Sequence, residues 1–259
     1  MSRQAIFAGG PFSEQLRELV GPLLPALDTS GFAPSLLAQA RRTWQQRFRA
    51  EFRSVQILTR FLHEVTGAGD PIDVYAGAVE LVRDEIRHAA LCASFCHALG
   101  APPLLPDPVE LRDPTQFLAA QYGERAMHTA LTMLVVNETI STALIADLRT
   151  RCDTPAARFV IDATLADEDT HGKWGIAYAR AALRRFPAST KPQWRQLVAT
   201  TLAPHQQFAA TKQGALADFP EPTLAALGLS SAERQAHVVD AALRGPVRSA
   251  LELLDLVPT

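Results

Sequence analysis

Clusters of glycine, proline and small polar residues divide this chain into long segments whose apolar residues follow a helical pattern. Strand-like alternation of β-branched residues is absent, so we expect an all-α fold. Proline lacks a backbone donor and clashes with the preceding helical turn, so a proline-rich stretch cannot form one continuous helix. The breaks predict four long helices, over residues 34–66, 72–99, 114 or 123 to 150, and 155–185.

The lengths of the connections predict how these helices are arranged. Short turns join the first helix to the second and the third to the fourth, so each pair should form an antiparallel hairpin. The proline-rich stretch 100–113 fits a long crossover along a four-helix bundle. We expect a short N-terminal helix over about 13–24 and two or three shorter helices after residue 187, split at Pro204, 219–222 and Gly245-Pro246.

These helices predict one domain over residues 1–259, with the bundle at 34–186 and a C-terminal extension, 187–259, packed on it. The 25 basic and 27 acidic residues give a net charge of -2, which argues against a nucleic-acid partner. No window of 18 uncharged apolar residues occurs, so no membrane span is expected. An odd, unpaired set of cysteines, Cys92, Cys96 and Cys152, favours reduced thiols and a cytoplasmic protein.

The pattern Asp-Glu-x-x-His occurs twice, at residues 84–88 and 167–171, in the middle of the second and fourth helices. Positions i and i+3 share one helix face, with Cβ atoms roughly 5–6 Å apart. Glu85 and His88 can therefore reach one metal ion, and so can Glu168 and His171. A single Glu-x-x-His is common on solvated helices, but two centred copies favour a metal site.

Each motif helix follows a helix that carries a candidate lone glutamate. Glu138 lies in the apolar stretch of the third helix, where an unpartnered buried carboxylate would be costly. The first helix offers Glu51 and Glu64. Glu85 lies 13 residues after the start of its helix, which is ~20 Å from the turn. Glu51, 16 residues before Gly67, is at a comparable height, whereas Glu64 is three residues from that glycine and would lie at the wrong end.

In the other hairpin, Glu138 lies 13 residues before Arg151 and Glu168 lies 13 residues after Pro155, so these two are also at one height. Four carboxylates and two histidines should therefore meet at one level of the bundle. Four buried carboxylates repel each other strongly, and two divalent cations would neutralise them. Mixed oxygen and imidazole ligands suit iron or manganese better than zinc. The predicted ligands are Glu51, Glu85, His88, Glu138, Glu168 and His171.

Residues 40–183 resemble the ferritin-like superfamily of diiron oxidases and oxygenases, which uses the same order of Glu and Glu-x-x-His ligands. The resemblance implies one metal ion held by Glu51, Glu85 and His88, and a second held by Glu138, Glu168 and His171, with Glu85 and Glu168 as the bridging carboxylates. It also implies that Asp84 and Asp167 hydrogen-bond the ligand histidines, and that Thr142 lines an oxygen pocket.

The resemblance further implies an oxidase or monooxygenase that uses two iron ions and O2 on a small or lipidic organic substrate, with electrons from an external reductase or ferredoxin. A mixed manganese–iron pair fits the same ligands. The alternatives are a ferroxidase or iron-handling protein, and a metal-stabilised binding protein without turnover. A homodimer is one option for the assembly. The residues expected to line a substrate cavity, one turn from the ligands, are Val55, Leu81, Cys92, Leu131, Val135, Leu165 and Gly175.

Overall fold

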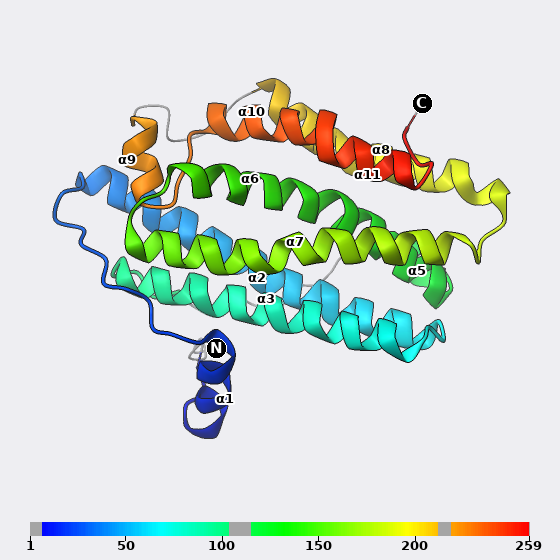
Figure 1. The fold of residues 1–259 in the computed structure, drawn as a ribbon, viewed down its shortest axis with the longest axis horizontal. Helices are drawn as coiled ribbons and strands as arrows, with labels where there is room; N and C mark the ends of the chain where they lie inside the picture. Colours follow the sequence, from blue (N-terminus) through cyan, green and yellow to red (C-terminus); the bar gives the residue numbers. More distant parts are fainter. Residues whose placement is uncertain (1–6, 104–114, 212–218, 259) are drawn as a thin grey trace.

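The computed structural model describes residues 7–103, 115–211 and 219–258 of the chain, and these residues form helices and no strand. The all-α prediction is therefore confirmed for the described residues. Figure 1 shows the long helices lying side by side, with the C-terminal helices across one face. In chain order the elements are α1 (Gly10–Val20), α2 (Pro34–Gly67), α3 (Ile72–Ala98), α4 (Thr115–Ala119), α5 (Tyr122–Thr129), η1 (Ala130–Asn137), α6 (Glu138–Arg151), α7 (Pro155–Leu183), η2 (Ala188–Thr190), α8 (Lys191–Thr211), α9 (Glu221–Ala226), α10 (Ala232–Ala242), η3 (Leu243–Val247) and α11 (Arg248–Leu253).

Helices α2 and α3 form an antiparallel hairpin, as the short connection between them predicts. Gly69 takes a φ of 71° in the turn, a conformation that favours glycine. Pro71, which has an extended backbone, directly precedes α3. The buried Asp70 carboxylate accepts a hydrogen bond from Tyr178 Oη at 3.0 Å and one from Arg185, both at the end of the α7 region. These contacts connect the turn between α2 and α3 to the hairpin that contains α7.

The segments α5, η1 and α6 follow one another as one long helix, and α7 packs against η1 and α6 as well as α3. Cys152 leaves the helical conformation with ψ of 122°, and Pro155 occupies the first turn of α7, where its missing N–H costs nothing. The predicted crossover over 100–113 lies mostly outside the described residues.

The apolar core consists of two clusters, which occupy opposite ends of the long helices. One includes Phe61, Leu134 and Tyr178, and the other includes Trp44 and Phe95. Along α2, α3 and α7, the residues between the two clusters include the predicted ligands. The polar site is therefore enclosed by apolar side chains on both sides along the helix axes.

Two predicted helix breaks in the C-terminal region are wrong. Pro204 lies inside α8, and Pro246 lies inside η3, which runs between α10 and α11 without a gap. An internal proline costs about 3 kcal/mol, but burying the apolar face of α8, which includes Val198 and Leu202, can offset that cost. At Pro246 the wider π-helical turn relieves the clash with the preceding carbonyl.

The N-terminal helix also differs from its predicted bounds. It begins at Gly10 and ends at Val20, because Gly21 adopts a φ of 80° that a helix cannot continue. Helix α1 makes its contacts with α3 and has no buried residue. Its partly buried last residue, Val20, packs against the core cluster that includes Trp44 and Phe95.

Among the described helices, the combined segment Tyr122–Arg151 is long and apolar enough to cross a membrane by length and composition alone. Its most apolar window is 44% buried inside the molecule, where it packs on α7, α8 and α10. The core helix of a soluble protein passes the same test, and this helix carries a buried glutamate, Glu138. The finding is weak support for a span.

Candidate metal centre

Six side chains from four helices converge between the two apolar clusters. They form two groups, and within each group the potential ligand atoms all lie within 4.8 Å of one another. Five of the side chains are 0–3% exposed, whereas that of Glu51 is 20% exposed. The two groups share one carboxylate and consist of Glu51, Glu85 and His88, and of Glu85, Glu138, Glu168 and His171.

Glu85 and Glu168 both lie between the two histidines. From His88 Nδ1, the distances are 3.8 Å to Glu85 Oε2 and 3.7 Å to Glu168 Oε1. From His171 Nδ1, they are 3.6 Å to Glu85 Oε1 and 3.5 Å to Glu168 Oε2. Each carboxylate thus offers one oxygen to each histidine, and the imidazole ring centroids are 6.0 Å apart. This is the placement that a bridging carboxylate needs.

The outer nitrogen of each histidine is held by an aspartate from the other motif. His88 Nε2 lies 3.1 Å from Asp167 Oδ2, and His171 Nε2 lies 3.1 Å from Asp84 Oδ2. Arg87 also donates to Asp167 Oδ2 at 2.6 Å. Such pairs fix the ring orientation and leave the Nδ1 atoms facing inward. The motifs are therefore interlocked across α3 and α7.

Burial and mutual repulsion set the protonation of the carboxyl groups. Burial raises the pKa of Glu51 and of Glu138 well above the ordinary glutamate value, and the charges of Glu85 and Glu168 add to this effect. Burial opposes ionisation of Glu168 too, but the neighbouring Glu138 carboxyl and His171 lower its pKa to about 2. These surroundings therefore favour the protonated form of Glu51 and Glu138, and bound cations would favour the ionised form.

The histidines respond to the same surroundings in the opposite direction. Burial lowers the pKa of both imidazoles, but the neighbouring carboxylates outweigh it. For His171, Asp84 and Glu168 raise the pKa to about 9. For His88, Asp167 and Glu85 raise the pKa well above the ordinary value. The carboxylates around the two imidazoles therefore favour positive charge at the site.

The inward-facing atoms of the cluster fit a pair of cations. His88 Nδ1, His171 Nδ1, both oxygens of Glu85 and Glu168 Oε2 are buried and make no hydrogen bond. A buried polar atom without a partner costs about 1–3 kcal/mol, so five at one point need an explanation. Because all five are metal-ligand atom types that face one another, bound metal ions would satisfy them together.

The structure separates Glu64 from this cluster, as the height argument predicts. Glu64 is fully buried near the end of α2, where its carboxylate accepts a hydrogen bond from Thr129 at 3.0 Å. It also pairs with Arg60 at 3.3 Å and with Arg125 at 3.5 Å. Glu64 is thus part of a separate ion-pair network.

A cavity lies beside the cluster, and most of the residues predicted to line a pocket do not line it. Of the eight predicted lining residues, Cys92 lines it. Leu81, Leu131 and Val135 are buried in the apolar core instead. Thr142 donates to the carbonyl of Glu138 at 2.7 Å, so its hydroxyl is occupied by its own helix. The remaining three, Val55, Leu165 and Gly175, do not line this cavity either.

Gly175 has a different role, because it lets α7 approach η1. A Cβ atom at this position would lie 2.4 Å from Leu134 Cβ, so one of the two helices would have to shift.

The π-helical segment η1 directly precedes Glu138, whereas the sequence pattern predicts an ordinary α-helix there. Asn137, the last residue of η1, contacts His205 Nε2 at 2.9 Å. Such π-turns commonly occur at functional sites.

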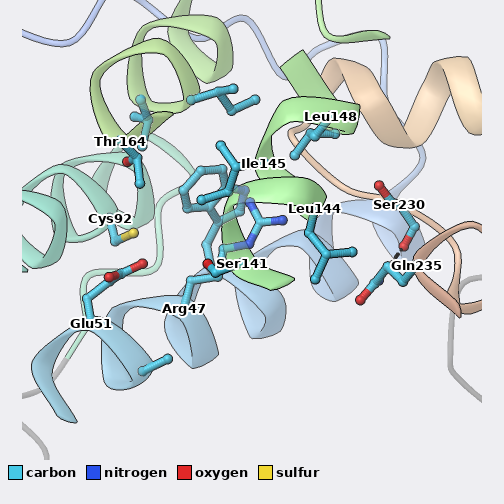
Figure 2. Close-up of a pocket in the computed structure, with 14 residues that line it drawn as sticks. Arg47, Glu51, Cys92, Ser141, Leu144, Ile145, Leu148, Thr164, Ser230 and Gln235 are labelled. Atoms are coloured by element: carbon cyan, nitrogen blue, oxygen red, sulfur yellow. Dashed lines mark hydrogen bonds between the residues drawn. The ribbon is translucent and has the colours of Figure 1, made fainter. Parts of the chain in front are cut away.

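The cavity itself has a volume of about 240 Å³ and reaches the cluster at Glu51, Cys92 and Thr164. Figure 2 shows the Arg47 guanidinium inside it, between the Glu51 carboxylate and the residues of α6. Sequence reasoning missed Arg47. Its position one helical turn before Glu51 on α2 was the available signal, because residues four apart share a helix face.

The other two cysteines, Cys96 and Cys152, are buried and form no disulfide, like Cys92.

No family model matches the chain, and neither does any curated protein or solved structure with which it was compared. The geometry of the cluster and its cavity is therefore what indicates a function.

Proposed function

We propose that this protein is a diiron oxidase or monooxygenase of the ferritin-like superfamily, which uses O2 to oxidise a small or lipidic organic molecule. The observation that carries the proposal is the contact between the cavity and the cluster. Glu51, a candidate ligand, lines a largely apolar cavity, so a bound organic molecule would lie directly beside the metal ions. A site for iron storage has no need of such a cavity.

The proposed metal ligands are the six residues of the two groups, with Glu85 and Glu168 shared between two iron ions. Oxygen and imidazole ligands suit iron, and a mixed manganese–iron pair is compatible with the same set. The proposed fold is a four-helix bundle of α2, α3, α5–η1–α6 and α7, whose second and third helices are joined by a crossover. The arrangement of ligands on these four helices supports that proposal.

When bound, a reduced pair of iron ions would supply electrons to O2 for oxidation of the substrate. The chain itself contributes a site in which five of the six ligands are 0–3% exposed, which limits the access of water to it. Asp84 and Asp167 hold the imidazoles in one orientation. Further electrons would come from an external reductase or ferredoxin, and we propose that the protein works in the cytoplasm.

The test is to purify the protein from iron-replete cells and measure metal content and O2 consumption together. We expect about two iron ions per chain. After anaerobic reduction, O2 uptake should stop once the bound iron is oxidised, and a chemical reductant should restore it. Continuous oxidation of added Fe(II) with mineral formation would instead identify an iron-storage protein. Purification with zinc alone, or with no metal, would refute the proposal.

A further inference from the structure

The cavity beside the cluster has one strongly polar feature within an otherwise apolar wall. Its lining includes Leu144, Ile145 and Leu148 from α6 and Val160 and Ile161 from α7. The hydroxyls of Ser141 and Thr164 and the Gln235 amide are neutral. The charged lining groups are Glu51, a candidate metal ligand, and Arg47.

Arg47 carries a positive charge that Glu51 favours through space but that no described residue pairs with directly. It makes no hydrogen bond and no ion pair with the residues that the structure describes. Its contact is with the face of Trp44, where the guanidinium carbon lies 4.6 Å from the ring centroid. Burial lowers its pKa, but the guanidinium group stays charged at neutral pH. A partly buried cation without a directly paired anion is costly, so its retention needs an explanation.

The surface under Arg47 is rigid. Trp44 is fully buried, stacks on Phe95 with ring centroids 4.0 Å apart, and donates from Nε1 to the Leu227 carbonyl at 2.9 Å. A guanidinium placed over the face of a fixed aromatic ring still has the N–H groups at its own edge available to a ligand. Arg47 therefore presents a preorganised set of donors to the cavity.

We propose that Arg47 binds the carboxylate of a small organic acid whose apolar body fills the rest of the cavity. The planar guanidinium matches a carboxylate with two parallel hydrogen bonds. A phosphate dianion would need a second cation, and the lining contains none apart from Arg47. This inference names a substrate class for the proposed function and rests on it, because the bound acid is a substrate only if Glu51 holds a metal ion.

The test compares acids with neutral molecules of the same shape. Hexanoate and benzoate are titrated into the iron-loaded full-length protein by calorimetry, alongside hexanamide and benzamide. We expect the acids to bind about tenfold or more tightly than the amides, because the charge-assisted pair is lost with the amides. R47Q should remove this preference, and R47K, which keeps the charge but not the planar fork, should restore part of it.

The matched control is R49Q, because Arg49 is exposed on the same helix and should not affect binding. Metal content and circular dichroism of each variant are measured in parallel. Equal binding of acids and amides, no binding of any of the four probes, or an acid preference that survives R47Q would overturn the inference. Acid preference in a protein that binds no iron would support the anion site and refute the proposed oxidase instead.

Discussion

Asp84 and Asp167 show how individual residues link the two halves of the site. Each lies on one motif helix and holds the imidazole of the other, so the orientation of both histidines depends on the contact between α3 and α7. The two aspartate–histidine pairs differ in the further contacts that their aspartates make. Arg87 donates to Asp167, whereas the equivalent position of the second motif is Thr170, which brings no charge. The Asp167 side of the cluster is therefore the more firmly held.

Glu168→Ala is predicted to lose at least one of the two proposed metal ions per chain, because Glu168 offers one oxygen to each histidine. Metal content by plasma emission spectroscopy provides the measurement. Asp169→Ala is the matched control, since Asp169 is the neighbouring carboxylate and is exposed with Lys173. Full metal content in Glu168→Ala would refute the ligand assignment.

Asp167→Ala is predicted to weaken metal binding about 10–100-fold without removing a ligand. The His88 ring loses the acceptor that orients it, and Arg87 loses its partner. Competition with a chelator of known affinity measures the change. Asp167→Asn, which retains an acceptor oxygen, should recover part of the loss. Equal affinity in the alanine variant and the parent protein would contradict a positioning role.

At the scale of elements, the contact between α7 and η1 determines where Glu138 lies. Glycine at position 175 allows the two backbones to approach, and the π-helical turn shifts the residues that follow it relative to an ordinary helix. Pro204 shows the same dominance of packing, since α8 continues through it. Local propensity alone would break the helix there, and tertiary burial keeps it intact.

Gly175→Ala is predicted to destabilise the protein by roughly 1–3 kcal/mol and to lower its metal content, because the added methyl group would overlap Leu134. Urea unfolding measures the first effect. Gly172→Ala is the control on the same helix: its Cβ would lie at an ordinary 3.6 Å from Thr139, so the change should be neutral or stabilising by up to about 1 kcal/mol. Equal effects of both substitutions would contradict the close approach.

At the scale of the whole molecule, the C-terminal region contributes Ser230 and Gln235 to the wall of the cavity. Hydrogen bonds and ion pairs connect this region to the long helices. Asp147 on α6 accepts hydrogen bonds from Arg151 at 2.7 Å and from Arg234 on α10. Trp44 on α2 donates to the Leu227 carbonyl, and Gly228 follows with a φ of 68° against the same ring. Gln235, next to this anchor, lines the cavity. The extension predicted as residues 187–259 thus contributes directly to the site.

Asp147→Asn is predicted to reduce stability at neutral pH by about 1 kcal/mol, because two partly buried charge-assisted contacts, which solvent partly screens, are weakened. Burial raises the pKa of Asp147, but Arg234 and Arg151 outweigh it and hold that pKa below the ordinary value. The stabilisation is therefore present above the unfolded-state pKa of about 3.9 and is lost as the pH falls through the lower folded-state value. Thermal unfolding of both proteins between pH 7 and pH 3 should show the difference shrinking in acid.

Asp240→Asn is the control for this effect. Asp240 pairs with Arg244 on an exposed helix face, and such pairs contribute about 0–1 kcal/mol. A constant difference between the Asp147→Asn variant and the parent protein across the pH range would show that the arginine contacts do not carry the stabilisation.

The sequence by itself determined the all-α class, the bounds of the long helices to within a few residues, and the common height of Glu51, Glu85, Glu138 and Glu168. These properties depend on proline, glycine and spacing along single helices, which are local. That the six residues bind metal stays a proposal, as do the fold family and the reaction. Only the tertiary structure decided which aspartate holds which histidine, where the π-turn occurs, and that Arg47 enters the cavity. Those features depend on how far each helix is rotated and how closely its neighbours approach, and contacts between residues distant in sequence set both.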